Sequence, residues 1–201
     1  IIKLQGTTAH AAEPEMGVNP ALAVSRIILA AEAMNNNNPS ADDFRLVTPV
    51  HIVMGEKAYG VSAGDAELHY TLRCWNNELL KETETALIRL ATEIAKQQGL
   101  DVSISFTQSF FANNNDKYAN DIVRKAAAAN SFTVAERGFP FKWGEDFGLF
   151  TTAYKGCMFG VGAGKDHPAL HNPDYDFPDE IIAVGVNSFH SITKILLAAD
   201  V

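Results

Sequence analysis

The order in which two hydrophobic periodicities follow each other along the first 107 residues constrains the fold more than any other feature of this chain. Alternating apolar and polar side chains predict strands at residues 1–4, 46–54, 66–74 and 102–106. Apolar residues at helical spacing predict helices over residues 20–34 and 78–98. Strand, helix, two strands, helix and strand is the order of the ferredoxin-like split βαβ arrangement, βαββαβ. We therefore expect residues 1–109 to form one complete α+β domain.

The predicted strands 46–54 and 66–74 differ in their faces. In strand 46–54, strict alternation would place Leu46, Val50, Ile52 and Met54 on one face, opposite Val47, His51 and Val53. Strand 66–74 has one apolar face and one charged face that ends at Arg73.

The second half of the chain is not a complete domain by the same criteria. The stretch 110–115, which ends in three asparagines, is typical of a linker or hinge. Helices are predicted after Asp116 and Asp179, with short strands at residues 132–135 and 157–161. Two short strands cannot cover two or three helices. We therefore expect further strands from sequence outside these 201 residues, and the first residues, which have the pattern of mid-strand, agree with a piece of a longer protein.

Composition excludes several classes of protein. Sixteen Lys and Arg against 24 Asp and Glu give a net charge of −8, which disfavours nucleic acid as a partner. Uninterrupted apolar runs fall well short of the ~18 residues of a membrane span, so we expect no membrane. Cys74 and Cys157 stand alone in apolar segments, a pattern typical of reduced thiols rather than of a disulfide framework. We expect a cytoplasmic protein.

His10 is presented in a way that suits a catalytic imidazole. It lies among small residues, in Gly6-Thr7-Thr8-Ala9-His10-Ala11-Ala12, and Pro14 stiffens the loop that follows. An uncrowded imidazole can donate a hydrogen bond to a developing oxyanion. A histidine that bonds a loop carbonyl has the same local pattern, so a structural role stays open.

Four further residues are candidates for binding. Arg73 suits a substrate carboxylate, or else forms a surface salt bridge with Glu67 or another acid. His171 lies in a predicted strand-to-helix loop, where it could bind a metal or be an ordinary loop histidine, because zinc needs about four ligands. Glu145 and Asp146 could support such ligands by hydrogen bonds, or be ordinary carboxylates at a helix start.

Three motifs, taken in order, resemble the dinuclear-zinc aminoacylase and carboxypeptidase family, and most closely its branch of N-acyl amino acid amidohydrolases. They are residues 6–14 with Gly17-Val18-Asn19-Pro20-Ala21, then Gly144-Glu145-Asp146-Phe147, then Leu170-His171-Asn172-Pro173-x-Tyr175-x-Phe177. The resemblance implies a lid that is also the dimerisation domain, residues 1–109, inserted into an α/β catalytic domain. Residues 110–201 would be the C-terminal segment of that zinc-hydrolase domain.

The resemblance also implies a function and roles for single residues. The family hydrolyses amide bonds in N-acyl amino acids, aminobenzoyl-type conjugates or small peptides, as homodimers with two divalent metals, here zinc. His10 matches the lid histidine that stabilises the tetrahedral intermediate, usually in the partner's active site. Arg73 is similar to the arginine that holds the substrate carboxylate, and His171 to the C-terminal metal ligand. Residues 59–65 depart from the family's Asn followed by Ile-Pro-Asp, so the substrate contacts are expected to differ.

The family's other metal ligands and its catalytic glutamate precede the lid. A single imidazole of a dinuclear set binds zinc poorly and leaves water without a general base, so we expect the isolated chain to be inactive. A noncatalytic dimerisation or assembly module, in which two βαββαβ units pair by their edge strands, is the alternative. An RNA-binding βαββαβ domain is disfavoured, because the open face lacks stacking aromatics and the chain is acidic.

Overall fold

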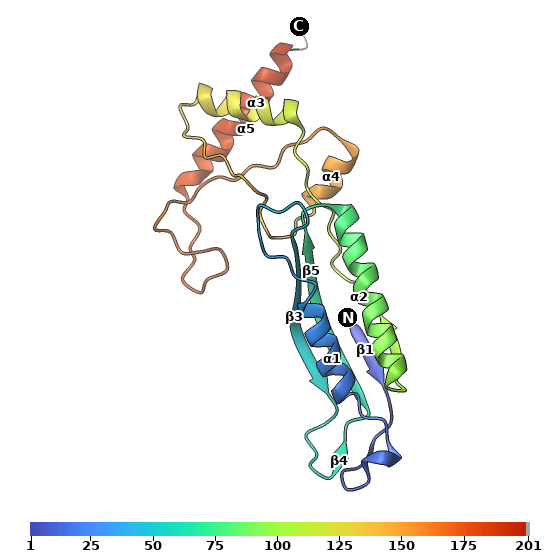
Figure 1. The fold of residues 1–201 in the computed structure, drawn as a ribbon. Coiled ribbons are helices and arrows are strands. Elements are labelled where there is room, and N and C mark those ends of the chain that lie inside the picture. The colour runs from blue at the N-terminus through green and yellow to red at the C-terminus, as the bar shows by residue number, and fades with distance from the viewer. Residues whose placement is uncertain (200–201) are drawn as a thin grey trace. The chain divides into compact units, whose positions relative to one another are not determined.

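The computed structural model describes residues 1–199, which divide into two compact units (Figure 1). The first unit comprises Ile1–Ala112 together with Gly138–Gly144. The second comprises Asn113–Arg137 and the residues from Glu145 onward.

The first unit contains a four-stranded antiparallel sheet and two long helices. The sheet has the strand order β3-β5-β1-β6, so β3 and β6 are its edges. In chain order the elements are β1 (Ile2–Gln5), β2 (Ala9–His10), the 3-10 helix η1 (Pro14–Met16), α1 (Ala21–Glu32), β3 (Arg45–Met54), β4 (Val61–Ser62), β5 (Asp65–Cys74), α2 (Asn77–Gln97) and β6 (Asp101–Ile104). The six strands and helices predicted for this region are all present, and β2 and β4 are additional.

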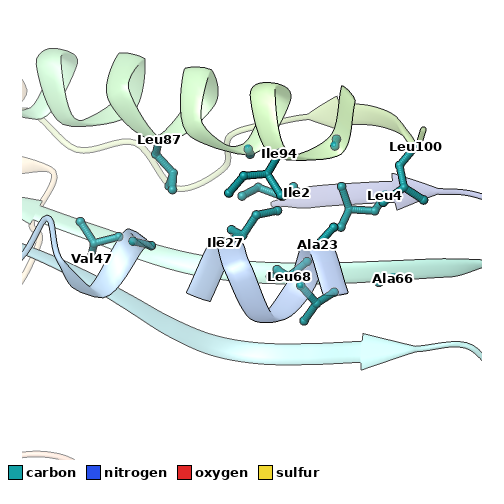
Figure 2. Packing of buried hydrophobic residues seen from close by; sticks show 14 residues of the cluster. Ile2, Leu4, Ala23, Ile27, Val47, Ala66, Leu68, Leu87, Ile94 and Leu100 are labelled. Atoms are coloured by element: carbon teal, nitrogen blue, oxygen red, sulfur yellow. The ribbon is translucent and has the colours of Figure 1, made fainter. Parts of the chain in front are cut away.

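The core of the first unit lies between one face of the sheet and the two helices (Figure 2). Leu68 of β5 and Ile27 of α1 are completely buried there, and Leu87 and Ile94 of α2 pack in the same cluster. Strand side chains alternate between faces, so the residues between these core positions point to the other face of the sheet. That other face is polar, as the charged face predicted for β5 requires.

The faces predicted for β3 are wrong, because the strand contains a β-bulge. Pro49 pairs with Tyr70 and His51 pairs with His69, so Val50 is an extra residue in the ladder. The extra residue changes the phase of alternation. Val47 is therefore buried on the helix-covered side, and Ile52, which strict alternation put on the opposite face, pairs with core residue Leu68.

Tyr70 brings a hydroxyl group into this core. Its Oη is buried and has no hydrogen-bond partner among residues 1–199, and burial raises the pKa of Tyr70 to about 12. The unfolded pKa is about 10. Because the unfolded chain loses this proton at a lower pH than the folded protein, the contribution of Tyr70 to the free energy of unfolding is constant below pH ~10. It falls as the pH rises from ~10 towards ~12.

We expect Tyr70→Phe to leave stability unchanged or to raise it by up to about 1 kcal/mol at neutral pH, because it removes an unpaired buried hydroxyl. The variant should also lose less stability than the wild type between pH ~10 and ~12. Urea unfolding followed by circular dichroism at neutral and alkaline pH measures both effects. A destabilised variant with an unchanged alkaline slope would show that the hydroxyl is satisfied in solution.

The second unit consists of helices joined by irregular segments. The helices are α3 (Lys117–Ala129), α4 (Phe147–Ala153) and α5 (Glu180–Ala199). Asp116 caps α3 by accepting a hydrogen bond from the Ala119 amide at 2.9 Å. Helix α3 packs against α5, and the Asn130 side chain donates to Ser191 Oγ at 2.8 Å.

The strands predicted at residues 132–135 and 157–161 are absent from the described part of the second unit. A strand needs a neighbouring strand to satisfy its backbone, and the described residues of this unit offer none. The Asn115 side chain takes that place beside Met158: its Nδ2 donates to the Met158 carbonyl and its Oδ1 accepts from the Met158 amide, both at 2.9 Å.

Cys74 and Cys157 are both free and partly buried. Burial raises the pKa of each thiol. The Cys157 thiol also donates to Asn120 Oδ1 at 3.3 Å. A thiol with a raised pKa stays protonated at neutral pH and is a poor nucleophile, so neither cysteine has the character of a catalytic residue.

Helix α5 exposes a strongly apolar surface in this structure. Among the described residues it is the helix long and apolar enough to cross a membrane by length and composition alone, with a mean hydropathy of 1.5 over Glu180–Ala198. Core helices of soluble proteins meet the same criterion. Its exposed large side chains are Ile182, Val186, Phe189, Leu196 and Leu197.

Candidate functional site

His10 lies in a small two-stranded sheet, formed by β2 and β4, at one end of the first unit (Figure 1). Strands β2 and β4 pair antiparallel, with His10 opposite Val61. Ser62 Oγ accepts from the Ala9 amide at 3.1 Å and donates to the Ala9 carbonyl at 3.3 Å. These contacts fix the backbone next to His10, while its imidazole remains exposed.

Glycines bring the backbones around His10 into direct contact. A Cβ atom on Gly6 would overlap the Val18 carbonyl oxygen, and one on Gly64 would lie 2.7 Å from the Thr8 amide nitrogen. Only glycine permits such an approach of one backbone to another. The same two glycines are joined by a hydrogen bond of 2.7 Å from the Gly6 amide to the Gly64 carbonyl. Segment 59–65, which departs from the family's pattern, therefore supports the His10 loop, a role that its sequence did not indicate.

The imidazole of His10 has a defined hydrogen-bonding polarity. The Ala12 amide donates to His10 Nδ1 at 3.1 Å. A ring nitrogen that accepts a hydrogen bond carries no proton, so the neutral ring carries its proton on Nε2. This nitrogen makes no hydrogen bond among the described residues and can donate to an external acceptor.

Arg73 lies on the polar face of the sheet, near the other end of β5. It pairs with Leu46 of the edge strand β3, and its side chain is half-buried. Its Nη1 donates to the Lys142 carbonyl at 2.7 Å. Within residues 1–199 it forms no ion pair, and the acid that was its alternative partner, Glu67, is bound elsewhere.

Glu67 is the centre of an ion network on the same polar face. It lies 2.9 Å from Lys3 Nζ through Oε2 and 2.7 Å from His69 Nε2 through Oε1. The hydrogen bonds from Lys3 and His69 lower the pKa of Glu67. His51 completes the row by an edge contact with the His69 ring, with 5.1 Å between centroids. Glu67 is therefore engaged by Lys3 and His69, and Arg73 has no counter-ion among residues 1–199.

The structure does not bring His10 and Arg73 together within one chain. The segment that carries His10 is bonded through Gly6 to Gly64, which lies next to the first residue of β5, and Arg73 is next to the last residue of that strand. A strand rises about 3.3 Å per residue, so the length of β5 from Asp65 to Arg73 is roughly 26 Å. A small substrate cannot bridge that length.

The other three candidates lie in the second unit. His171 is exposed and has a left-handed backbone with φ of 71°, which is uncommon for a residue other than glycine. Glu145 and Asp146 are exposed, and Asp146 is at the start of α4 without a capping hydrogen bond from its side chain. Across the described residues no group of three or more His, Cys, Asp or Glu side chains could hold a metal ion.

The first unit is similar to a known domain family. Residues 1–99 match the family model of the M20 peptidase dimerisation domain. An N-acetyldiaminopimelate deacetylase of Streptococcus uberis is 26% identical over 172 residues, which cover 85% of this chain and 45% of that protein. A hippurate hydrolase of Campylobacter jejuni is 25% identical over 188 residues, which cover 90% of this chain and 48% of that protein. The chain thus spans about half the length of the curated relatives it matches.

Solved structures share the fold over almost the whole chain. An aminopeptidase from Bacillus cereus matches with a TM-score of 0.75 and 16% identity, covering 95% of this chain and 49% of that one. A dinuclear metal binding peptidase of the M20 family from Bacillus subtilis matches with a TM-score of 0.71 and 20% identity, covering 98% and 50%. The family model thus identifies residues 1–99 as a dimerisation domain of the M20 peptidase family, and the similarity to proteins of that family in sequence and in fold extends over almost the whole chain.

Proposed function

We propose that this chain supplies the dimerisation domain and part of the catalytic domain of a metal-dependent hydrolase. The substrates are N-acyl amino acids, aminobenzoyl-type conjugates or small peptides, and the bond cleaved is an amide. The relatives named N-acetyldiaminopimelate deacetylase and hippurate hydrolase support this class of substrate. The peptidases among the structural matches support the family's hydrolytic chemistry.

The observation that carries this proposal is the hydrogen bond from Ala12 to His10 Nδ1. It leaves Nε2–H as an exposed donor on a small two-stranded sheet whose neighbouring backbones are packed closely at Gly6 and Gly64. A preorganised donor of this kind stabilises the oxyanion that forms when an amide carbonyl is attacked. Arg73, whose donors meet no acid among residues 1–199, holds the carboxylate of the substrate.

We further propose that His10 acts on a substrate held by the partner subunit. The roughly 26 Å between the two ends of β5 supports this, because His10 and Arg73 of one chain cannot contact the same small molecule. A twofold dimer solves the problem when it pairs each His10 end with the opposite end of its partner. His10 and Arg73 of different chains then serve one site.

The edge strand β3 is the surface we propose for this dimer. It is ten residues long, whereas the other edge, β6, has four. Beyond Pro49, which cannot donate to a ladder, β3 exposes Val50, Ile52, Val53 and Met54. Antiparallel pairing over residues 50–54 lets the β2–β4 sheet of each chain, which carries His10, extend along the partner's sheet towards the partner's Arg73.

Lysine substitutions on this edge are expected to separate the dimer. The double variant Ile52→Lys and Val53→Lys brings like charges together across the twofold axis, and we expect the dimer dissociation constant to rise about 100-fold or more. Sedimentation velocity measures the mass relative to the 21.8 kDa chain. Ser103→Lys on β6 is the matched control and should leave the dimer intact. A wild-type monomer at high concentration, or a control that dissociates as readily, would contradict this interface.

The metals that the family implies do not fit the residues of this chain alone. His171 is the one residue here that the resemblance assigns as a ligand, and the described residues make no metal cluster around it. We propose that the other ligands, the general base and two zinc ions belong to a catalytic site completed by sequence outside this chain. Glu145 and Asp146 would support the ligands of that site. The contributions of this chain are then the His10 donor and the Arg73 guanidinium.

The architecture that we propose follows the same division. The strand order β3-β5-β1-β6 with α1 and α2 supports a ferredoxin-like lid at residues 1–109. Residues 110–201 are proposed as the C-terminal segment of the α/β catalytic domain, and the exposed apolar residues of α5 support its packing against further sequence. A cytoplasmic location is likewise a proposal, supported by the two free thiols.

Activity measurements with and without the rest of the enzyme test the function. We expect the 201-residue chain to release no product from N-acetyl or N-benzoyl amino acids in the presence of zinc, and the full-length protein to hydrolyse at least one of them. Amine release and metal content are the measurements. Stoichiometric zinc with turnover in the isolated chain would contradict the proposed division of the site. A full-length dimer without hydrolytic activity would favour an assembly module instead.

A further inference from the structure

A short segment between the two glycines Gly138 and Gly144, here named the strap, packs with the first unit although both flanking segments belong to the second. Lys142 anchors it. The Lys142 carbonyl accepts the hydrogen bond from Arg73, and its Nζ donates to Asn37 Oδ1 at 3.0 Å. The same Nζ lies 5.1 Å from the centroid of the Phe44 ring.

The strap leaves Arg73 with unused binding capacity. A guanidinium has five N–H donors, and the described contacts of Arg73 use one of them, on a neutral carbonyl. The charge is half-buried and unpaired within residues 1–199 of a chain that has 24 acidic residues. Such a cation favours an anionic ligand, and a carboxylate matches the geometry of its remaining donors.

The strap carries two stacked aromatic rings, on the residues next to the one that Arg73 contacts. Phe141 and Trp143 flank Lys142, and their rings stack with centroids 4.2 Å apart and planes 16° apart. The Lys142 carbonyl carbon is bonded directly to the Trp143 amide nitrogen, so the guanidinium lies beside the backbone of Trp143. Trp143 is 52% exposed, which leaves aromatic surface for a further ring.

We propose that the strap makes this enzyme selective for an aromatic acyl group, with Trp143 as the residue that determines specificity and Phe141 as the ring that supports it. The inference rests on the proposed role of Arg73 in the same site. In an N-aroyl amino acid, one amide group and one Cα separate the ring from the carboxylate. This separation is comparable with the one in the strap, where a single residue of backbone lies between the Lys142 carbonyl that Arg73 contacts and the side chain of Trp143. An N-acetyl amino acid offers the carboxylate but leaves the exposed indole uncovered.

Binding to the 201-residue chain can be measured without turnover. The chain has two tryptophans, so NMR of the isotope-labelled chain gives two indole signals, one from Trp143 and one from Trp75. We expect N-benzoylglycine to shift the Trp143 signal saturably and to bind about tenfold more tightly than N-acetylglycine, because a stacked ring removes apolar surface from water. Trp143→Ala should abolish that preference without changing the affinity for N-acetylglycine.

Two further variants separate the contributions of the ring and the charge. Arg73→Gln should weaken both ligands by about tenfold, because both share the carboxylate. Phe106→Ala, which removes another aromatic side chain of similar exposure, should change neither affinity. Equal affinities for the two ligands, equal weakening of both by Trp143→Ala, or no shift of the Trp143 signal would overturn the inference. The proposed hydrolase function would survive such a result if the full-length enzyme cleaves N-acetyl amino acids. Conversely, tighter binding of N-benzoylglycine than of N-acetylglycine would support the inference even if the full-length enzyme proved inactive.

Discussion

Replacing His10 with alanine in the full-length enzyme is expected to lower kcat by about 100- to 1,000-fold and to leave KM within about twofold. The physical reason is that the Nε2–H donor meets an oxyanion that exists only after the carbonyl is attacked. Steady-state kinetics on an N-acyl amino acid measures both constants. Glu13→Ala, in the same exposed loop, is the matched control and should retain the kinetics of the wild type. Parallel losses in kcat and in substrate affinity would indicate a binding role instead.

Mixed dimers test whether His10 acts across the subunit interface. A His10→Ala chain keeps its own Arg73, and an Arg73→Gln chain keeps its own His10. If the two residues of one site come from different chains, a mixed dimer contains one intact site and one site that lacks both groups. Random exchange of equal amounts should then recover about a quarter of the wild-type activity. Two residues acting within one chain would give no recovery above the separate variants.

Ile27→Ala is expected to lower the free energy of unfolding of the first unit by about 3 to 4 kcal/mol. Ile27 of α1 is fully buried in the core that α1 forms with α2 and the sheet, so truncation removes apolar contacts and leaves a cavity (Figure 2). Leu29→Ala is the matched control on the same helix, because Leu29 is 74% exposed. We expect that control to change stability by less than about 0.5 kcal/mol. Urea denaturation followed by circular dichroism compares the two variants, and similar losses in both would contradict the packing described for α1.

The regular elements of the first unit could be predicted from the sequence because each has a hydrophobic pattern of its own. Burial of one helix face requires apolar residues at helical spacing, as in α1 and α2, and burial of one sheet face requires alternation, as in β5. These patterns are local, so they can be identified without knowing what each element packs against. The irregularities were missed for the same reason. The bulge at Val50 depends on its pairing with β5, and alternation along β3 alone predicted the wrong face for Ile52.

The second unit shows where local patterns fail. Residues 132–135 and 157–161 have the composition of strands, yet a strand is stabilised by hydrogen bonds to a neighbour rather than by its own residues. In the described structure the Asn115 side chain makes those bonds to Met158 instead. The helices α3 and α5 were predictable, since helical hydrogen bonds are made within one segment.

For the candidate site, the sequence alone determined the residue types and motifs: His10 among small residues, Arg73 on a charged strand face, and His171, Glu145 and Asp146 in loops near helices. The tertiary structure decided which nitrogen of His10 is free to donate, that Arg73 bonds a backbone carbonyl of the strap rather than Glu67, and that a whole strand separates His10 from Arg73. The reason is that these features depend on hydrogen bonds between residues far apart in the chain. Gly6 and Gly64, for example, come into contact only when β1 and β5 pair, and no local sequence pattern indicates that contact.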